Sequence, residues 1–185
     1  MGSTTGNMNY TNFYISHFAP DQWLSGLDLN KGICIVAGPR KSGLTTTLHA
    51  SAQKIENSGR KTAFICNQSD FPKNAPLTFD PATETSQKPG DKHNSTEKAF
   101  IKASNSGADV LIVDLNLPSA FKCAIQAAHN GFLVIGEIKS NYDLTEITNV
   151  IVNEYPNIIG CLERLMVQRI NFDNGEAIIE TTTSI

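Results

Sequence analysis

The stretch that decides the fold is Gly38-Pro-Arg-Lys-Ser-Gly-Leu-Thr-Thr-Thr-Leu48. It follows a short apolar run, Ile33–Ala37, and opens a stretch of helical character that ends near Asn57. Glycines at positions 38 and 43 let backbone N–H groups turn inward around an anion, and the N-terminus of a helix adds its dipole. Both spacing and context are those of a phosphate-binding loop. The alternative is a glycine-rich turn from strand to helix that binds nothing.

This loop departs from the phosphate-binding pattern at one position, where Leu44 replaces a lysine. The lysine would contact the β- and γ-phosphates and offset their charge, which leucine does not do. Thr45 stands where the Mg²⁺-binding hydroxyl belongs, and Arg40 and Lys41 are the cations inside the loop. We predict no catalytic residue, and no cofactor unless ATP or ADP binds with Mg²⁺. In that case the candidate nucleotide-binding residues of the loop are Gly38, Pro39, Arg40, Lys41, Ser42, Gly43, Leu44, Thr45 and Thr46, with Thr45 as a Mg²⁺ ligand.

Outward from the loop, apolar runs of strand length alternate with helical stretches. The central strands are expected at Ile33–Ala37, Thr62–Cys66, Val110–Asp114 and Leu133–Ile138. Helices are expected over residues 45–57, over 94–106 behind an Asn-Ser-Thr-Glu capping box, from Pro118 to 130, and over 144–153. Strands that are apolar throughout and alternate with helices predict an α/β domain of three layers with a mainly parallel sheet.

Two further segments are less regular. Residues 67–93 are polar and contain four prolines, which predicts a long irregular loop. Residues 165–182 contain two apolar runs separated by Asp-Asn-Gly at 173–175, which predicts a C-terminal antiparallel hairpin.

The composition is that of a globular protein, with 40% hydrophobic and 18% charged residues among 185. A net charge of −3 provides no basic surface for nucleic acid or for an anionic membrane. The apolar runs are far shorter than the roughly 20 residues that span a bilayer, and the first residues lack the regions of a secretory signal. We therefore predict a cytoplasmic protein in which residues 1–31 pack on one domain formed by residues 32–185.

The sulfur and imidazole side chains show no ligand-like spacing. We predict reduced thiols in the core and histidines in loops or on the surface, rather than disulfides or metal ligands. These residues are Cys34, Cys66, Cys123 and Cys161, and His17, His49, His93 and His129.

The loop resembles that of the type II/type IV secretion ATPase family, the hexameric motors of pilus extension, pilus retraction (twitching motility) and type II secretion. In that family the loop reads Gly-Pro-Thr-Gly-Ser-Gly-Lys-[Ser/Thr]-Thr-Thr-Leu. Residues 107–114, Gly-Ala-Asp-Val-Leu-Ile-Val-Asp, are similar to the family's Walker B strand, with Asp114 in place of its glutamate. The resemblance implies that Asp114 is a further candidate nucleotide-binding residue and Mg²⁺ ligand. Residues 132–141 are similar to the family segment that contains the histidine box, and Gln168-Arg169 is similar to its Gln-Arg strand. Both occur in the same order along the chain as in the family. The resemblance implies a RecA-like phosphate-loop ATPase core with degenerate catalytic motifs.

Most departures from the family pattern fall on charged positions. Uncharged residues replace the loop lysine, both carboxylates of an acidic box and three arginines, and a lysine replaces the second histidine of a histidine box. The residues found here are Leu44, Asn67, Gln68, Ile101, Asn105, Asn149 and Lys139. The family's N-terminal domain and C-terminal helical extension are expected to be absent, because only about 30 residues precede the first strand and the chain ends at Ile185.

Three hypotheses remain open at this point. The first is an ATPase-like subunit without turnover that binds or regulates a bacterial type IV pilus or type II secretion apparatus. The second is an active ATPase in which Arg40 or Lys41 replaces the missing lysine, and the third is a protein-binding module with no nucleotide site. The expected partners are apparatus proteins, among them an active paralogous ATPase, with at most peripheral contact with the inner membrane and none with nucleic acid. A monomer or small oligomer is expected.

Overall fold

A computed structural model describes residues 20–72, 75, 77–84, 94–170 and 177–183 of the chain. They form a mixed sheet of seven strands in the order β3-β2-β4-β5-β1-β6-β7. Six strands pair in parallel and β7 pairs antiparallel with β6. The strands are β1 (Gly32–Gly38), β2 (Thr62–Ile65), β3 (Thr78–Phe79), β4 (Val110–Asp114), β5 (Leu133–Lys139), β6 (Leu162–Ile170) and β7 (Ala177–Thr183).

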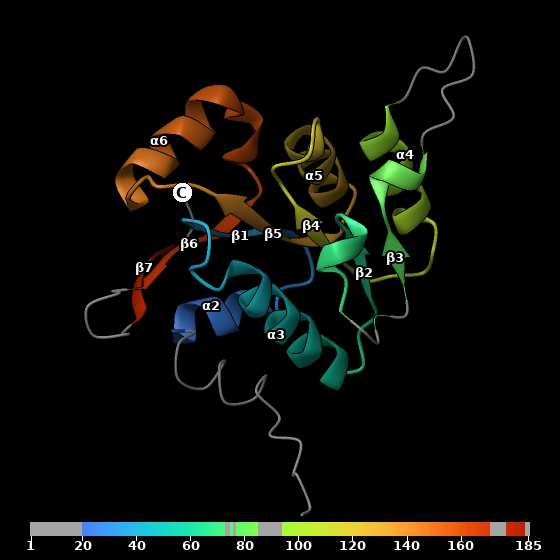
Figure 1. Cartoon of the computed structure of the whole chain (residues 1–185), viewed down its shortest axis with the longest axis horizontal. Helices are drawn as coiled ribbons and strands as arrows, with labels where there is room; N and C mark the ends of the chain where they lie inside the picture. The colour runs from blue at the N-terminus through green and yellow to red at the C-terminus, as the bar shows by residue number, and fades with distance from the viewer. Residues whose placement is uncertain (1–19, 73–74, 76, 85–93, 171–176, 184–185) are drawn as a thin grey trace, which may run out of the picture.

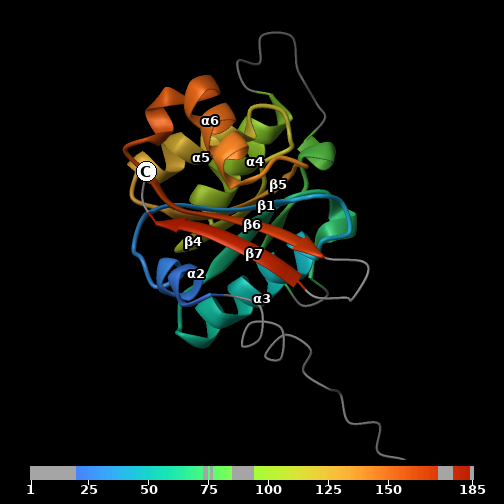
Figure 2. The same cartoon turned by 90° about the vertical axis from the view of Figure 1, so that its left-hand side faces the viewer.

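Helices cover both faces of this sheet, which gives the molecule three layers (Figures 1 and 2). One face carries α2 (Asp21–Gly26) and α3 (Leu44–Asn57). The other carries α4 (Ser95–Ser104), α5 (Ala120–His129) and α6 (Leu144–Glu154). Short 3₁₀ turns lie at Gln68–Asp70, Pro81–Glu84 and Pro156–Ile158. Within the described ranges, none of the helices has the length and apolar character needed to cross a membrane.

The core consists of two apolar clusters, one on each face of the sheet. Successive side chains of a strand point to opposite faces, so a strand with both faces covered is apolar throughout. In β4, for example, Leu111 and Val113 belong to the cluster under α4 and α5, while Val110 and Ile112 belong to the cluster under α3. This two-sided burial confirms the α/β class and the four central parallel strands.

The C-terminal strands also confirm the prediction of an antiparallel pair, which extends the sheet through β6. The predicted Asn-Gly turn at residues 173–175 lies outside the described residues.

The cysteines are free and buried, and burial raises the pKa of the Cys34 thiol to about 12.

Several element boundaries differ from the predictions. Helix α5 begins at Ala120 behind Ser119, whose φ of 63° is left-handed, so Pro118 precedes the helix instead of forming its first turn. The described part of the expected loop contains β3, which pairs with β2, and Asp80 accepts a hydrogen bond from Gln68 N–H at 3.1 Å. The prolines of this segment predicted a loop. The short strand β3 was not predicted, because it forms by pairing with β2, which is separate from it in the sequence.

Helix α2 brings the segment before β1 against the sheet. Its Trp23 is 1% exposed, and the indole Nε1–H donates to Ser51 Oγ on α3 at 3.0 Å. Trp23 therefore belongs to the core. Residues 1–19, including Phe18 and His17, lie outside the described residues.

Candidate functional site

The phosphate-loop sequence joins the carboxyl end of β1 to the N-terminus of α3, the edge of a parallel sheet at which ligands bind. Two residues hold the turn in left-handed conformations, Lys41 with a φ of 70° and Gly43 with a φ of 87°. Ser42 N–H donates to Pro39 O at 3.2 Å. A non-glycine residue with positive φ is uncommon and marks a tightly constrained turn.

A buried glutamine on β6 holds this loop from behind. Gln168 is 2% exposed, and its Nε2 donates to the Ser42 carbonyl at 2.5 Å. Its Oε1 accepts from the Thr47 hydroxyl at 2.7 Å. A side chain at Gly38 would place its Cβ 2.2 Å from the Gln168 carbonyl oxygen, so only glycine fits there. The sequence shows Gln168 as part of a Gln-Arg pair, but its hydrogen bonds to Ser42 and Thr47 appear only in the structure.

The side chains of the loop point in different directions. Leu44, in the lysine position, is 5% exposed and belongs to the core cluster between α3 and the sheet. Arg40 and Lys41 are exposed. Ser42 is buried, and its Oγ has no hydrogen-bond partner among the described residues.

Beside the loop, two buried carboxylates lie opposite each other on neighbouring strands. Asp114 ends β4 and pairs in register with Glu137 of β5; the two are 4% and 3% exposed. Thr45, at the start of α3, donates its hydroxyl to Glu137 Oε2 at 3.2 Å. Two of the candidate residues, Thr45 and Asp114, are therefore brought together by Glu137, which the sequence analysis did not single out.

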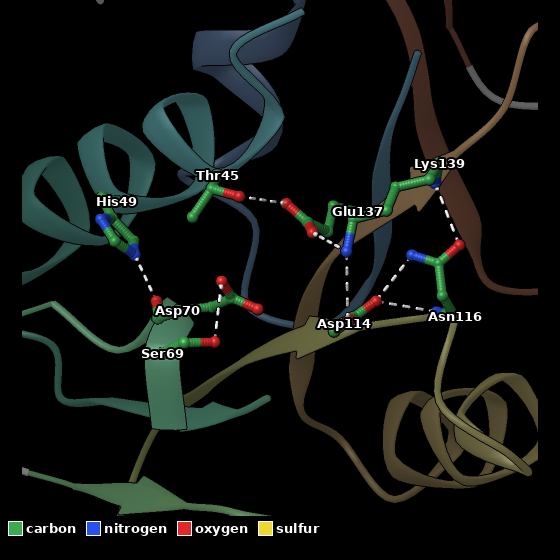
Figure 3. A network of polar contacts seen from close by, with 8 residues as sticks. All are labelled: Thr45, His49, Ser69, Asp70, Asp114, Asn116, Glu137 and Lys139. Carbon is green, nitrogen blue, oxygen red and sulfur yellow. Dashed lines mark hydrogen bonds and ion pairs between the residues drawn. The ribbon is translucent and has the colours of Figure 1, made fainter. Parts of the chain in front are cut away.

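Lys139 supplies the positive charge for this pair. Its Nζ lies 3.7 Å from Asp114 Oδ2 and 3.6 Å from Glu137 Oε1, and Figure 3 shows it between the two carboxylates. Burial raises the pKa of Glu137 and Asp114 raises it further, while Lys139 and the Thr45 hydroxyl act in the opposite direction. From the sequence, Lys139 is identified only as the residue that replaces a histidine of the family pattern.

The residues in the acidic-box positions do not face this group. Asn67 and Gln68 are exposed, whereas the following Asp70 lines a small pocket together with His49, Asp114 and Glu137. His49 is half-buried on α3, and His129 is exposed at the end of α5. His49 Nε2 lies 2.8 Å from the Asp70 carbonyl oxygen (Figure 3).

The three positions at which the family has arginine lie on the opposite face of the sheet. Ile101 is on α4, Asn105 is the residue that follows α4, and Asn149 is on α6; all three are exposed. Ile101 and Asn105 line a groove between α4 and α5. Within one chain, these positions are not part of the site formed by the loop and the carboxylates.

The donor set fits a Mg²⁺–nucleotide complex poorly. Thr45, Asp114 and Glu137 offer the oxygen ligands that Mg²⁺ prefers, but the Lys139 ammonium already lies within 4.0 Å of both carboxylates and offsets one of their negative charges. Leu44 brings no charge to the loop, and the loop's two cations, Arg40 and Lys41, are exposed. Across the described ranges, no three His, Cys, Asp or Glu side chains are grouped as metal ligands.

Together the sheet order, the layers and the loop define a three-layer α/β fold, and solved structures of RecA-like phosphate-loop ATPases match the chain. The ATPase DotB of Legionella pneumophila matches with a TM-score of 0.70 and 15% identity, over 92% of this chain and 50% of DotB. The pilus retraction motor PilT, solved with bound ADP, matches with a TM-score of 0.69 and 20% identity, over 90% and 51%. The VirB11 ATPase of the Brucella suis type IV secretion system, solved with sulphate, gives 0.57 and 14%, over 94% and 53%.

These matches establish the fold and support the resemblance to secretion ATPases that the motifs indicate. The chain spans about half the length of the solved chains it matches. No protein-family model matches the sequence, and no curated protein matches it at a significant level.

Proposed function

We propose that this chain is a secretion- or pilus-ATPase-like protein that does not hydrolyse ATP. Its role is that of a binding or regulatory subunit of a bacterial type IV pilus or type II secretion apparatus. The partners proposed are apparatus proteins, including an active paralogous ATPase, met in the cytoplasm or at the inner face of the membrane. The support for the apparatus is the fold that the chain shares with DotB, PilT and VirB11.

The position of Leu44 carries the proposal. Its side chain is 5% exposed within an apolar cluster, so the loop lacks the cation that contacts transferring phosphates. Phosphoryl transfer depends on positioned charge, and removal of such groups lowers rates by orders of magnitude. The exposed side chains of Arg40 and Lys41 make the surrogate-lysine hypothesis the weaker one.

Steady-state phosphate release tests the absence of turnover. Wild-type protein and Leu44→Lys should both release phosphate no faster than a blank without protein, with or without Mg²⁺. The single repair fails because catalytic groups act as a unit, and because Asp114 and Glu137 remain paired with Lys139.

Lys41→Ala is the variant that separates the alternatives. If the wild type hydrolyses ATP in a Mg²⁺-dependent way and Lys41→Ala abolishes the activity, the loop has recruited a surrogate lysine and the proposal fails. A titration with ATP and ADP in the same buffers separates the remaining hypotheses, since a pure protein-binding module binds neither nucleotide.

A further inference from the structure

The oxygen atoms of Asp114 and Glu137 divide into two sets. Asp114 Oδ1 accepts hydrogen bonds from Asn116 Nδ2 at 2.6 Å and from Asn116 N–H at 2.9 Å. Glu137 Oε2 accepts from Thr45. The remaining oxygens, Asp114 Oδ2 and Glu137 Oε1, are those that converge on Lys139 Nζ (Figure 3). Each carboxylate is thus fixed through one oxygen and offers the other to the same cation.

The backbone places Lys139 for this contact. Lys139 follows Glu137 by two positions on β5, so both side chains point to the face of the sheet that carries α3. Its own N–H donates to Asn116 Oδ1 at 3.1 Å, which links the lysine to the residue that orients Asp114. The side chain is 36% exposed, so it reaches the carboxylates from the solvent side.

The electrostatics of the pair require a cation at this point. Like charges directly opposite each other on adjacent strands destabilise a sheet, and buried carboxylates are costly unless they are paired. Asp70, which lines the pocket beside them, adds a third negative charge. Lys139 is the cation within 4.0 Å of Asp114 and Glu137 among the described residues.

We propose that the Lys139 ammonium is a built-in cation that takes the place of a divalent metal ion beside Thr45. While it is present, Asp114 and Glu137 do not bind Mg²⁺. Its removal uncovers a divalent-metal site formed by these two carboxylates and the Thr45 hydroxyl. The proposal concerns the protein without nucleotide, so it and the absence of hydrolysis can fail independently.

Titration with Mn²⁺, followed by the electron paramagnetic resonance signal of the free ion, tests the proposal on the full chain. Lys139→Met removes the ammonium, and Lys139→Gln removes the charge but keeps a hydrogen-bond donor between the carboxylates. The matched control is Lys102→Met, which removes an exposed ion pair with Glu84 far from this site. Both Lys139 variants should bind one Mn²⁺ per chain at least tenfold more tightly than the wild type and the control, and Mg²⁺ should compete.

Circular dichroism establishes that each variant is folded before it is titrated. The proposal is overturned if a folded Lys139 variant binds Mn²⁺ no better than the control. The wild type provides a second measurement that needs no variant: a saturable site for one Mn²⁺ per chain, with a matching rise in unfolding temperature, also overturns it.

Discussion

At the scale of single residues, the site arises where apolar strands become polar at their carboxyl ends. On the face that carries α3, β4 runs from Val110 and Ile112 to Asp114. On the same face of β5, the apolar residues give way to Glu137 and Lys139. The local sequence marked Asp114 through its motif but not Glu137, because the pairing of the two is a property of strand register.

The bracing of the loop by Gln168 leads to a prediction about stability. Gln168→Ala leaves the Thr47 hydroxyl without its partner and the Ser42 carbonyl without its donor, in a buried environment. A buried polar group without a partner costs about 1–3 kcal/mol, so we expect the free energy of unfolding in urea to fall by about 2–3 kcal/mol. The control Gln126→Ala, at an exposed position of α5, should stay within about 0.5 kcal/mol of the wild type. Equal effects of the two variants would contradict the bracing role.

At the scale of elements, helix starts that depend on near neighbours in the sequence are the easiest to predict. The capping box of α4 was expected from Asn94 and Glu97, and each side chain accepts from the other residue's N–H. The start of α5 differs from its prediction, because Ser119 adopts a left-handed conformation and its side chain makes no capping hydrogen bond. Local signals therefore locate a helix start when the cap lies within the same turn.

Helix α6 offers a test of capping that is independent of the site. Asp143 accepts from Glu146 N–H at 2.8 Å, and Glu146 Oε2 accepts from Asp143 N–H at 3.0 Å. Asp143→Ala removes the first bond and the negative charge at the helix N-terminus, which should cost about 1 kcal/mol of unfolding free energy. Thermal unfolding of this variant beside Asn153→Ala, an exposed change at the other end of α6, measures the difference. A loss no greater than that of Asn153→Ala would argue against the cap.

At the scale of the whole molecule, the shared fold extends over at least 90% of this chain in the DotB, PilT and VirB11 matches. The fold follows from burial on both faces of the sheet, which many sequences satisfy. The charged positions of the family are not needed for that burial. Ile101, Asn105 and Asn149 are exposed, so a fold can be kept while the charges at such positions change.

Assembly is the property that these exposed positions should alter. The resemblance implies that arginines of one subunit reach phosphates bound by its neighbour, and this chain has Ile101, Asn105 and Asn149 in their places. We therefore expect that nucleotide does not act as a charged link between subunits, and that the protein is a monomer or small oligomer whose sedimentation coefficient is unchanged by ATP and Mg²⁺. A hexamer that forms on addition of ATP would refute this prediction.

The sequence by itself determined the α/β class, the central strands and the phosphate-loop turn, because apolar runs, glycines and caps act over a few residues. It also identified Leu44, Thr45 and Asp114 as positions to examine. Three features become visible once the chain is folded: Leu44 lies in the core, Gln168 holds the loop and Lys139 bridges two buried carboxylates. These contacts join strands and loops that are distant in sequence, and their geometry depends on sheet order and register, which local patterns do not encode.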